Sequence, residues 1–189
     1  MNAMVAPTET ITTENVVAST AVDQELDLVA LAVDLEPADY NPDRFPGLVF
    51  RTDAPRAAML VFSSGEVVVT GANSEAVAHE ALAKLFDELE RLGIDVPESP
   101  SATVQNIVST ADLGCPLNLT AIAIALGLER IEYEPEQFPG LVYRMDEPSV
   151  VLLLFGSGKL VITGATQVTD VELALERIYA RLDEHGLLD

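Results

Sequence analysis

Few side chains in this 189-residue chain have the types and spacing that covalent catalysis needs. The sequence GSGK at 156–159 is similar to part of a phosphate-binding loop, but that loop needs a glycine where Leu153 stands and a hydroxyl residue where Leu160 stands. His79 and His185 lie outside any cysteine or carboxylate pattern with metal-ligand spacing. No nucleophile is paired with a base either. We therefore expect that the chain is not an enzyme and that it binds no metal or cofactor.

Hydrogen bonding by short polar side chains and contact by aromatic rings are the chemistry that the sequence does offer, and both occur in duplicate. The sequence FPGLVFR at 45–51 recurs as FPGLVYR at 138–144, FSSG at 62–65 as FGSG at 155–158, and VVVTGA at 67–72 as LVITGA at 160–165. NVV at 15–17 matches NIV at 106–108. This self-similarity predicts a fused pseudo-dimer with a flexible tail at 1–9, a first repeat at 10–97 and a second repeat at 98–187.

The elements that must position these residues follow one order in both repeats. A β-prone run precedes a short helical segment, and extended stretches separated by turn residues follow. The β-prone runs lie at 11–20 and 102–111, the short helices at 26–33 and 117–126, and the hairpin turns at Gly65 and Gly158. This order predicts two β-α-β-β-β-β-α halves whose strands join into one antiparallel sheet.

Each repeat is predicted to end in an amphipathic helix. Ser74 is placed to cap the first helix, and Thr169 and Glu172 have the spacing of a capping box in the second. Gly93 and Gly186 are expected to follow the helix ends. The apolar residues at helical spacing are Ala78, Leu82, Leu85, Phe86 and Leu89 in the first helix and Val171, Leu175, Ile178 and Leu182 in the second. Short connections place both helices on one face of the sheet.

The predicted strands have apolar residues at both odd and even positions, and therefore on both faces of the sheet, as in EVVVTG at 66–71 and KLVITG at 159–164. An antiparallel sheet with one solvated face would instead alternate apolar and polar residues. Because the helices cover only one face, we expect the other to expose a large apolar surface, which usually marks a binding site. A dimerising scaffold that hides this face and a small-molecule binder that uses it as a pocket floor are the alternatives.

Period-2 alternation assigns residues to that open face. They are Asn15, Val17, Leu60, Phe62, Val68 and Thr70 in the first repeat and Asn106, Val108, Leu153, Phe155, Val161 and Thr163 in the second. This inventory fits the minor groove of B-DNA, where A·T pairs show only acceptors and a G·C pair adds an amine. Amides and hydroxyls can donate to the acceptors, apolar side chains penalise the amine, and phenylalanines can wedge between base steps and kink the duplex.

The order, duplication and spacing of these motifs resemble the TATA-box-binding protein family over residues 10–187, and that family is itself the standard example of the kinking wedge. The resemblance implies an α+β saddle with pseudo-two-fold symmetry. Two β-α-β-β-β-β-α repeats would form one curved ten-stranded antiparallel sheet, with the helices on its convex face. The implied function is that of a general transcription initiation factor that binds the TATA box and recruits transcription factor B and, indirectly, RNA polymerase.

The resemblance also implies roles for individual residues. Phe45 with Phe62, and Phe138 with Phe155, would intercalate, while Asn15, Asn106, Thr70, Thr163, Val17, Val68, Val108, Val161, Leu60 and Leu153 would contact bases. Arg51, Arg144 and Lys159 would meet the DNA backbone, and Glu134, Glu136 and Gln137 would contact transcription factor B. A homodimer away from DNA is left open as a further partner.

The charge balance conflicts at first with a DNA-binding role. Ten basic residues stand against 31 acidic ones, which gives a formal net charge of -21, and acidic chains normally repel phosphate. Glu66, Asn73 and Thr166 also stand where the family usually has lysine. In molar salt the Debye length falls to about 3 Å and this repulsion is screened. The composition therefore predicts a protein of a salt-loving archaeal cell.

The sequence also predicts where in the cell the protein works. The N-terminus lacks the features of a secretory signal, and no apolar run approaches the length of a membrane span. The lone Cys115 cannot form an internal disulfide, which fits a reducing cytosol. We expect a cytoplasmic, nucleoid-associated protein with no membrane partner.

Overall fold

The computed structural model of the chain describes residues 6–98 and 101–188. Its first repeat contains β1 (Thr12–Ala21), α1 (Leu28–Asp34), β2 (Ala38–Asp39), β3 (Leu48–Asp53), β4 (Arg56–Val61), β5 (Glu66–Ala72) and α2 (Glu75–Arg91). Its second contains β6 (Thr103–Asp112), α3 (Leu119–Leu126), β7 (Ile131–Glu132), β8 (Leu141–Met145), β9 (Val150–Leu154), β10 (Lys159–Ala165) and α4 (Val168–Glu184). The predicted β-α-β-β-β-β-α order is confirmed in both repeats.

Within the described residues, the strands hydrogen-bond in the order β2-β3-β4-β5-β1-β6-β10-β9-β8-β7, and the pairings within each repeat are antiparallel. The α+β class and the ten-stranded sheet are thus confirmed. The chain divides into two compact units, one of residues 14–105 and the other of residues from 106 onward with the segment before 14. The repeat boundaries at 10–97 and 98–187 stay a prediction.

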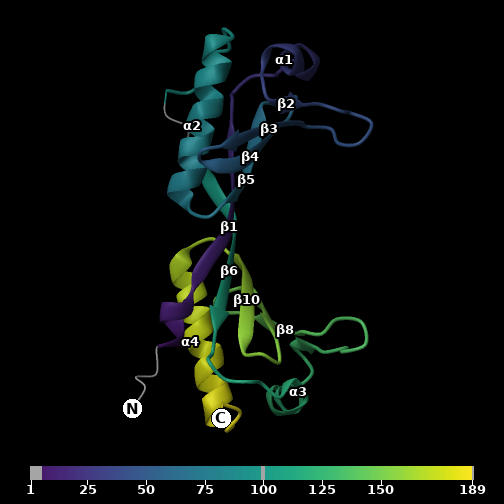
Figure 1. The fold of residues 1–189 in the computed structure, drawn as a ribbon, viewed down its shortest axis with the longest axis vertical. Coiled ribbons are helices and arrows are strands. Elements are labelled where there is room, and N and C mark those ends of the chain that lie inside the picture. Colours follow the sequence, from purple (N-terminus) through teal and green to yellow (C-terminus); the bar gives the residue numbers. More distant parts are fainter. Residues whose placement is uncertain (1–5, 99–100, 189) are drawn as a thin grey trace. The chain divides into compact units, whose positions relative to one another are not determined.

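A long helix forms the core of each unit with one sheet face. In the first unit α2 packs on β4 and β5, and in the second α4 packs on β9 and β10 (Figure 1). Every residue predicted for the apolar helix faces is buried, and Leu85 and Leu175 have no exposed surface. Fully burying a leucine side chain contributes about 1.5–3 kcal/mol. Packing of the apolar helix face therefore fixes which face of the sheet stays open in each unit.

The helix ends agree with the sequence at three of four positions. Ser74 caps α2, because its hydroxyl accepts a hydrogen bond from the Val77 N–H at 3.2 Å. Gly93 and Gly186 follow the ends of α2 and α4 as predicted.

The capping box predicted at the start of α4 is wrong. Gln167 occupies the cap position without a side-chain hydrogen bond, and Thr169 already lies inside the helix. The helix begins at Val168, soon after β10 ends at Ala165, and this start buries Val171 against the sheet. No polar side chain marks this start in the sequence.

The two short helices begin two residues later than predicted. The Asp27 carboxylate accepts hydrogen bonds from the N–H groups of Val29 and Ala30, and the Asn118 side chain accepts one from Ala121. Both residue types are strong helix caps, so the sequence held a signal that hydrophobic spacing alone overlooked.

The described part of the segment before β1 is ordered against the second unit, whereas a flexible tail was expected at 1–9. Pro7–Thr10 forms a turn of 3-10 helix that packs against α4, and the Asp112 N–H donates to the Thr10 hydroxyl at 2.9 Å. The rest of the tail, residues 1–5, lies outside the described residues. In the described part of the chain, no helix combines the length and apolar character needed to cross a membrane.

Candidate nucleic-acid interface

Alternation along the strands leaves an open apolar face on each unit. In β4, Leu60 is half-buried between Met59 and Val61, which are both fully buried on the helix side. Leu60 lies opposite Val68 of β5, so both side chains share the face that α2 does not cover. The strand positions that were predicted to face away from the helix in the first repeat do so in the structure.

The second unit repeats this arrangement. Leu153 of β9 lies opposite Val161 of β10, and both are half-buried while Leu152 and Ile162 are fully buried. Asn15, Val17, Asn106 and Val108 are likewise half-buried on alternating positions of β1 and β6. The structure thus brings each set of predicted base-contact residues together within its own unit.

Four apolar residues of these faces were missed by the sequence analysis. Val49 lies opposite Leu60, and Val142 lies opposite Leu153. Ala58 and Val151 lie opposite the two threonines, Thr70 and Thr163. Counting by two from Leu60 or from Leu153 would have found Ala58 and Val151, whereas Val49 and Val142 needed the register of β3 and β8.

Each face carries one asparagine and one threonine whose side chains are hydrogen-bonded together. The Asn106 Nδ2 donates to the Thr163 hydroxyl at 3.2 Å, and the Asn15 Nδ2 to the Thr70 hydroxyl at 3.4 Å. In the same pairs the asparagine Oδ1 accepts from the Gly164 N–H and the Gly71 N–H, both at 2.7 Å.

The backbone fixes which way the asparagine amides point. An N–H group needs an oxygen as acceptor, so the bond from Gly164 places Oδ1 inward and leaves the NH₂ group toward the threonine and the open face. Gly164 has a φ of 97° beside the register shift of β10 against β6, a conformation that side chains on Cβ disfavour. Each unit therefore holds an asparagine amide in a preset orientation, with a threonine hydroxyl beside it that can accept from the NH₂ group or donate to Oδ1.

Two phenylalanines meet edge to face near the end of each open face. The Phe45 and Phe62 ring centroids lie 5.8 Å apart at 63°, and those of Phe138 and Phe155 lie 5.9 Å apart at 71°. Phe138 remains 38% exposed, which is high for a large apolar side chain. These rings are available for contact with a ligand.

A glycine makes room for each ring pair. A Cβ on Gly140 would lie 2.6 Å from the Phe138 ring and 3.0 Å from the Phe155 ring, and a Cβ on Gly47 would lie 2.7 Å from the Phe45 ring. The glycine of the duplicated FPG motif is thus required by close approach, and it explains why Phe and Gly recur together.

The residues predicted to meet phosphates are exposed but differ in their contacts. Arg144 donates from Nε and Nη2 to the Glu132 carboxylate at 3.2 and 3.0 Å, a surface pair that contributes little stability. Arg51 and Lys159 are exposed, Arg51 on the strand equivalent to that of Arg144 and Lys159 at the start of β10. Glu134, Glu136 and Gln137 are also exposed, and Gln137 donates a hydrogen bond to the Glu134 carboxylate.

The fold and the open faces define a two-repeat α+β protein with duplicated apolar sheet surfaces. The model of the family "Transcription factor TFIID (or TATA-binding protein, TBP)" matches residues 10–92 and 101–185. The chain therefore belongs to the TATA-box-binding protein family, whose members are DNA-binding transcription factors rather than enzymes.

Individual relatives agree with this assignment. The chain is 63% identical over 186 residues to TATA-box-binding protein 1 of Haloferax volcanii, covering 98% of both chains. It is 61% identical over 186 residues to TATA-box-binding protein E of Halobacterium salinarum, covering 98% of this chain and 100% of the relative. The solved structure of Methanococcus jannaschii TBP matches with a TM-score of 0.84 and 50% identity over 92% of this chain and 98% of that one. The first two organisms are halophilic archaea, in agreement with the acidic composition.

Proposed function

We propose that this protein binds the TATA box of promoters through the minor groove, kinks it with its paired phenylalanines, and recruits transcription factor B and, through it, RNA polymerase. The observation that carries the proposal is the open sheet face of each unit, where apolar side chains surround a preset Asn–Thr donor pair. A homodimer that covers this face is the state we propose away from DNA.

The chemistry of the face matches A·T-rich minor grooves. The amide of Asn106 is held with its NH₂ group outward, so it can donate to adenine N3 and thymine O2. The hydroxyl of Thr163 lies 3.2 Å from the Nδ2 and 3.3 Å from the Oδ1 of Asn106, and its proton can turn from that oxygen to an acceptor on the DNA. Around them Leu153 and Val161 offer nothing to the exocyclic amine of a G·C pair, which would lose its water without a new partner.

The phenylalanine pairs supply the wedge. Phe138 is exposed and the other three rings are half-buried, so one ring of each pair can enter between base steps while the second ring supports it. Minor-groove proteins, the TATA-binding protein among them, insert apolar side chains in this way and unstack the bases. Arg51, Arg144 and Lys159 then meet the backbone of the bent duplex.

The exposed loop of the second repeat is the proposed contact for transcription factor B. It carries Glu134 and Glu136, whereas the equivalent loop of the first repeat, which begins at Asn41, carries Asp43 and Arg44. The loops share their backbone hydrogen bonds, since the Phe45 N–H donates to the Asn41 carbonyl and the Phe138 N–H to the Glu134 carbonyl. The two loops differ in charge, and a partner protein can therefore bind one repeat in preference to the other.

A gel-shift experiment tests both the binding of the TATA box and the recruitment of transcription factor B. We expect the protein to shift a TATA duplex in preference to a scrambled duplex, and transcription factor B to shift the complex further. The double variant Glu134→Ala, Glu136→Ala should keep the binary complex and weaken the ternary one by about tenfold, the scale of a loss at central interface residues.

Asp43→Ala is the matched control, because Asp43 holds the equivalent place to Glu136 in the first loop. It should leave both complexes unchanged. Loss of the ternary complex in the control alone would assign transcription factor B to the other loop, and equal binding of both duplexes would reject TATA recognition itself.

A further inference from the structure

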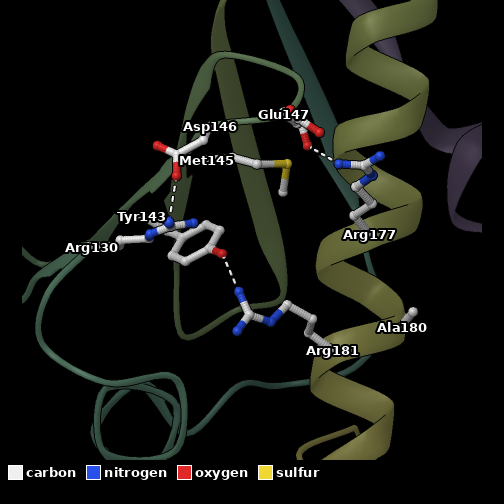
Figure 2. A pocket seen from close by; sticks show the side chains of 8 residues that line it. All are labelled: Arg130, Tyr143, Met145, Asp146, Glu147, Arg177, Ala180 and Arg181. Carbon is white, nitrogen blue, oxygen red and sulfur yellow. Dashed lines mark hydrogen bonds and ion pairs between the residues drawn. The ribbon is translucent and has the colours of Figure 1, made fainter.

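A cavity with three arginines lies on the second unit, away from its open sheet face. It is open to solvent and has a volume of about 530 Å³ between α4 and the turn that joins β8 to β9 (Figure 2). The residues that matter for its chemistry are Arg130, Arg177 and Arg181, with Tyr143, Met145 and Asp146. Asp146 and Glu147 also line it, so three arginines against two carboxylates leave one net positive charge, in a chain with only eight arginines and a net charge of -21.

Contacts within the cavity hold the guanidinium groups in place without using most of their donors. Arg181 Nη1 donates to the Tyr143 hydroxyl at 2.5 Å, and its guanidinium carbon lies 5.9 Å from the ring centroid. Arg177 donates to the backbone carbonyl of Glu147 (Figure 2). A guanidinium has five N–H donors, so several on each group remain for a ligand.

The first unit contains the equivalent cavity and shows that arginines at the positions of Arg130 and Arg181 are not needed to build the fold. That cavity, of about 370 Å³, lies between α2 and the turn that joins β3 to β4. Lys84 there donates to the Ala54 carbonyl, just as Arg177 does to Glu147. The other cationic positions are replaced, since Pro37 stands for Arg130 and Glu88 for Arg181.

A further acidic residue distinguishes the first cavity. Asp87 lines it where Ala180 lines the second. The aromatic floor changes together with the charge, because Phe50 takes the place of Tyr143 and needs no hydrogen-bond partner. The first cavity thus has three carboxylates against Arg51 and Lys84, whereas the second has three arginines against two carboxylates.

We propose that the arginine-lined cavity of the second unit docks a short acidic segment of a partner protein, with its carboxylates on Arg130 and Arg181 and an apolar side chain against Tyr143 and Met145. Charge complementarity selects this occupant, and several guanidinium groups spread around one cavity suit several carboxylates on one chain. A volume near 530 Å³ is ample for a few side chains.

The existing ion pair does not block such a ligand. Arg130 Nη2 lies 2.5 Å from the Asp146 carboxylate, but the two side chains are 51% and 67% exposed, so the pair contributes little and a ligand carboxylate can replace Asp146. Bidentate hydrogen bonds from arginine act at contact distance, whereas molar salt screens charges farther apart. Docking of this kind therefore survives the salt in which a diffuse positive surface would lose its effect.

Fluorescence anisotropy of the full chain in molar potassium chloride tests the proposal. The probe is a short fluorescein-labelled peptide of glutamates that flank one leucine, and the matched peptide has glutamine in place of glutamate. The variant Ala180→Asp, Arg181→Glu takes the residues that stand at the same places in the first repeat. The carboxylate at position 181 would accept a hydrogen bond from the Tyr143 hydroxyl, in place of the one that Arg181 donates to it. We expect the glutamate peptide alone to bind and this variant to weaken it by about tenfold or more.

Arg91→Glu is the control, because it reverses an arginine charge in the same way on α2, where the second repeat has Glu184. It should leave peptide binding unchanged, and all variants should retain TATA binding and the thermal midpoint of unfolding. Equal peptide binding by the charge-swapped variant, or by the glutamine peptide, would overturn the proposal. Displacement of the peptide by inorganic phosphate at comparable concentration would overturn it too, because the cavity would then be a small-anion site.

Discussion

Replacing Phe155 or Phe138 with alanine is expected to abolish the kink in bound TATA DNA. Their rings form one edge-to-face pair at 5.9 Å, and removal of either leaves the other without its support at the edge of the second unit's open face. Loss of one aromatic contact with a base costs about 1–3 kcal/mol, so binding should also weaken. Fluorescence transfer between dyes at the two ends of the duplex measures the bend directly.

Two comparisons separate the wedge from folding effects. Phe155→Leu keeps an apolar wedge and should retain part of the bend, since leucine is also found between base steps in minor-groove complexes. The thermal midpoint of Phe155→Ala should change little, because this residue is only half-buried and the core residues under it stay in place. A full bend in both alanine variants would rule out intercalation by this pair.

The second large effect is the dependence of DNA affinity on salt concentration. We expect the affinity for a TATA duplex to stay flat or to rise as potassium chloride increases above physiological concentration. Ordinary DNA-binding proteins lose affinity because each phosphate contact releases counterions, with a slope of about −0.9 per contact. This chain has few cations to meet phosphates, and its acidic side chains take up cations when they approach the duplex.

Glu66 and Lys159 offer matched variants for this prediction, because they occupy the first position of the equivalent strands β5 and β10. Glu66→Lys should make the slope of log affinity against log salt more negative by about 1, and Lys159→Glu should shift it by about 1 in the opposite sense. A steep fall in the affinity of the unaltered protein above physiological salt would contradict the halophilic adaptation.

Duplication made much of the fold predictable. Two copies of the same strand and helix pattern gave two independent views of each element, and apolar residues at both parities indicated an uncovered sheet face. The buried faces of α2 and α4 follow directly from helical spacing, because burial of residues such as Leu85 and Leu175 decides the side that packs. Local polar signals were weaker guides, as the absent cap of α4 shows.

The details of the site depend on register, which a single sequence does not contain. Val49 and Val142 join the open faces only through pairing of β3 with β4 and of β8 with β9. The outward orientation of the Asn106 amide depends on an N–H group that a strand irregularity presents at Gly164. The arginine-lined cavity was likewise not predicted, since Arg130 and Arg181 are far apart in sequence and line one cavity only in the folded unit.

The central claim is that an apolar face with preset donors reads the minor groove, and base analogues test it most directly. An inosine·cytosine pair lacks the exocyclic amine of G·C, so it offers the minor groove the same acceptors as an A·T pair while its major-groove face matches G·C. Equilibrium binding of three duplexes, with A·T, inosine·cytosine or G·C pairs at the centre of the site, separates the two grooves. We predict equal affinity for the first two and a loss of about 1–3 kcal/mol for each G·C pair. Equal weakening by inosine·cytosine and G·C would contradict minor-groove recognition.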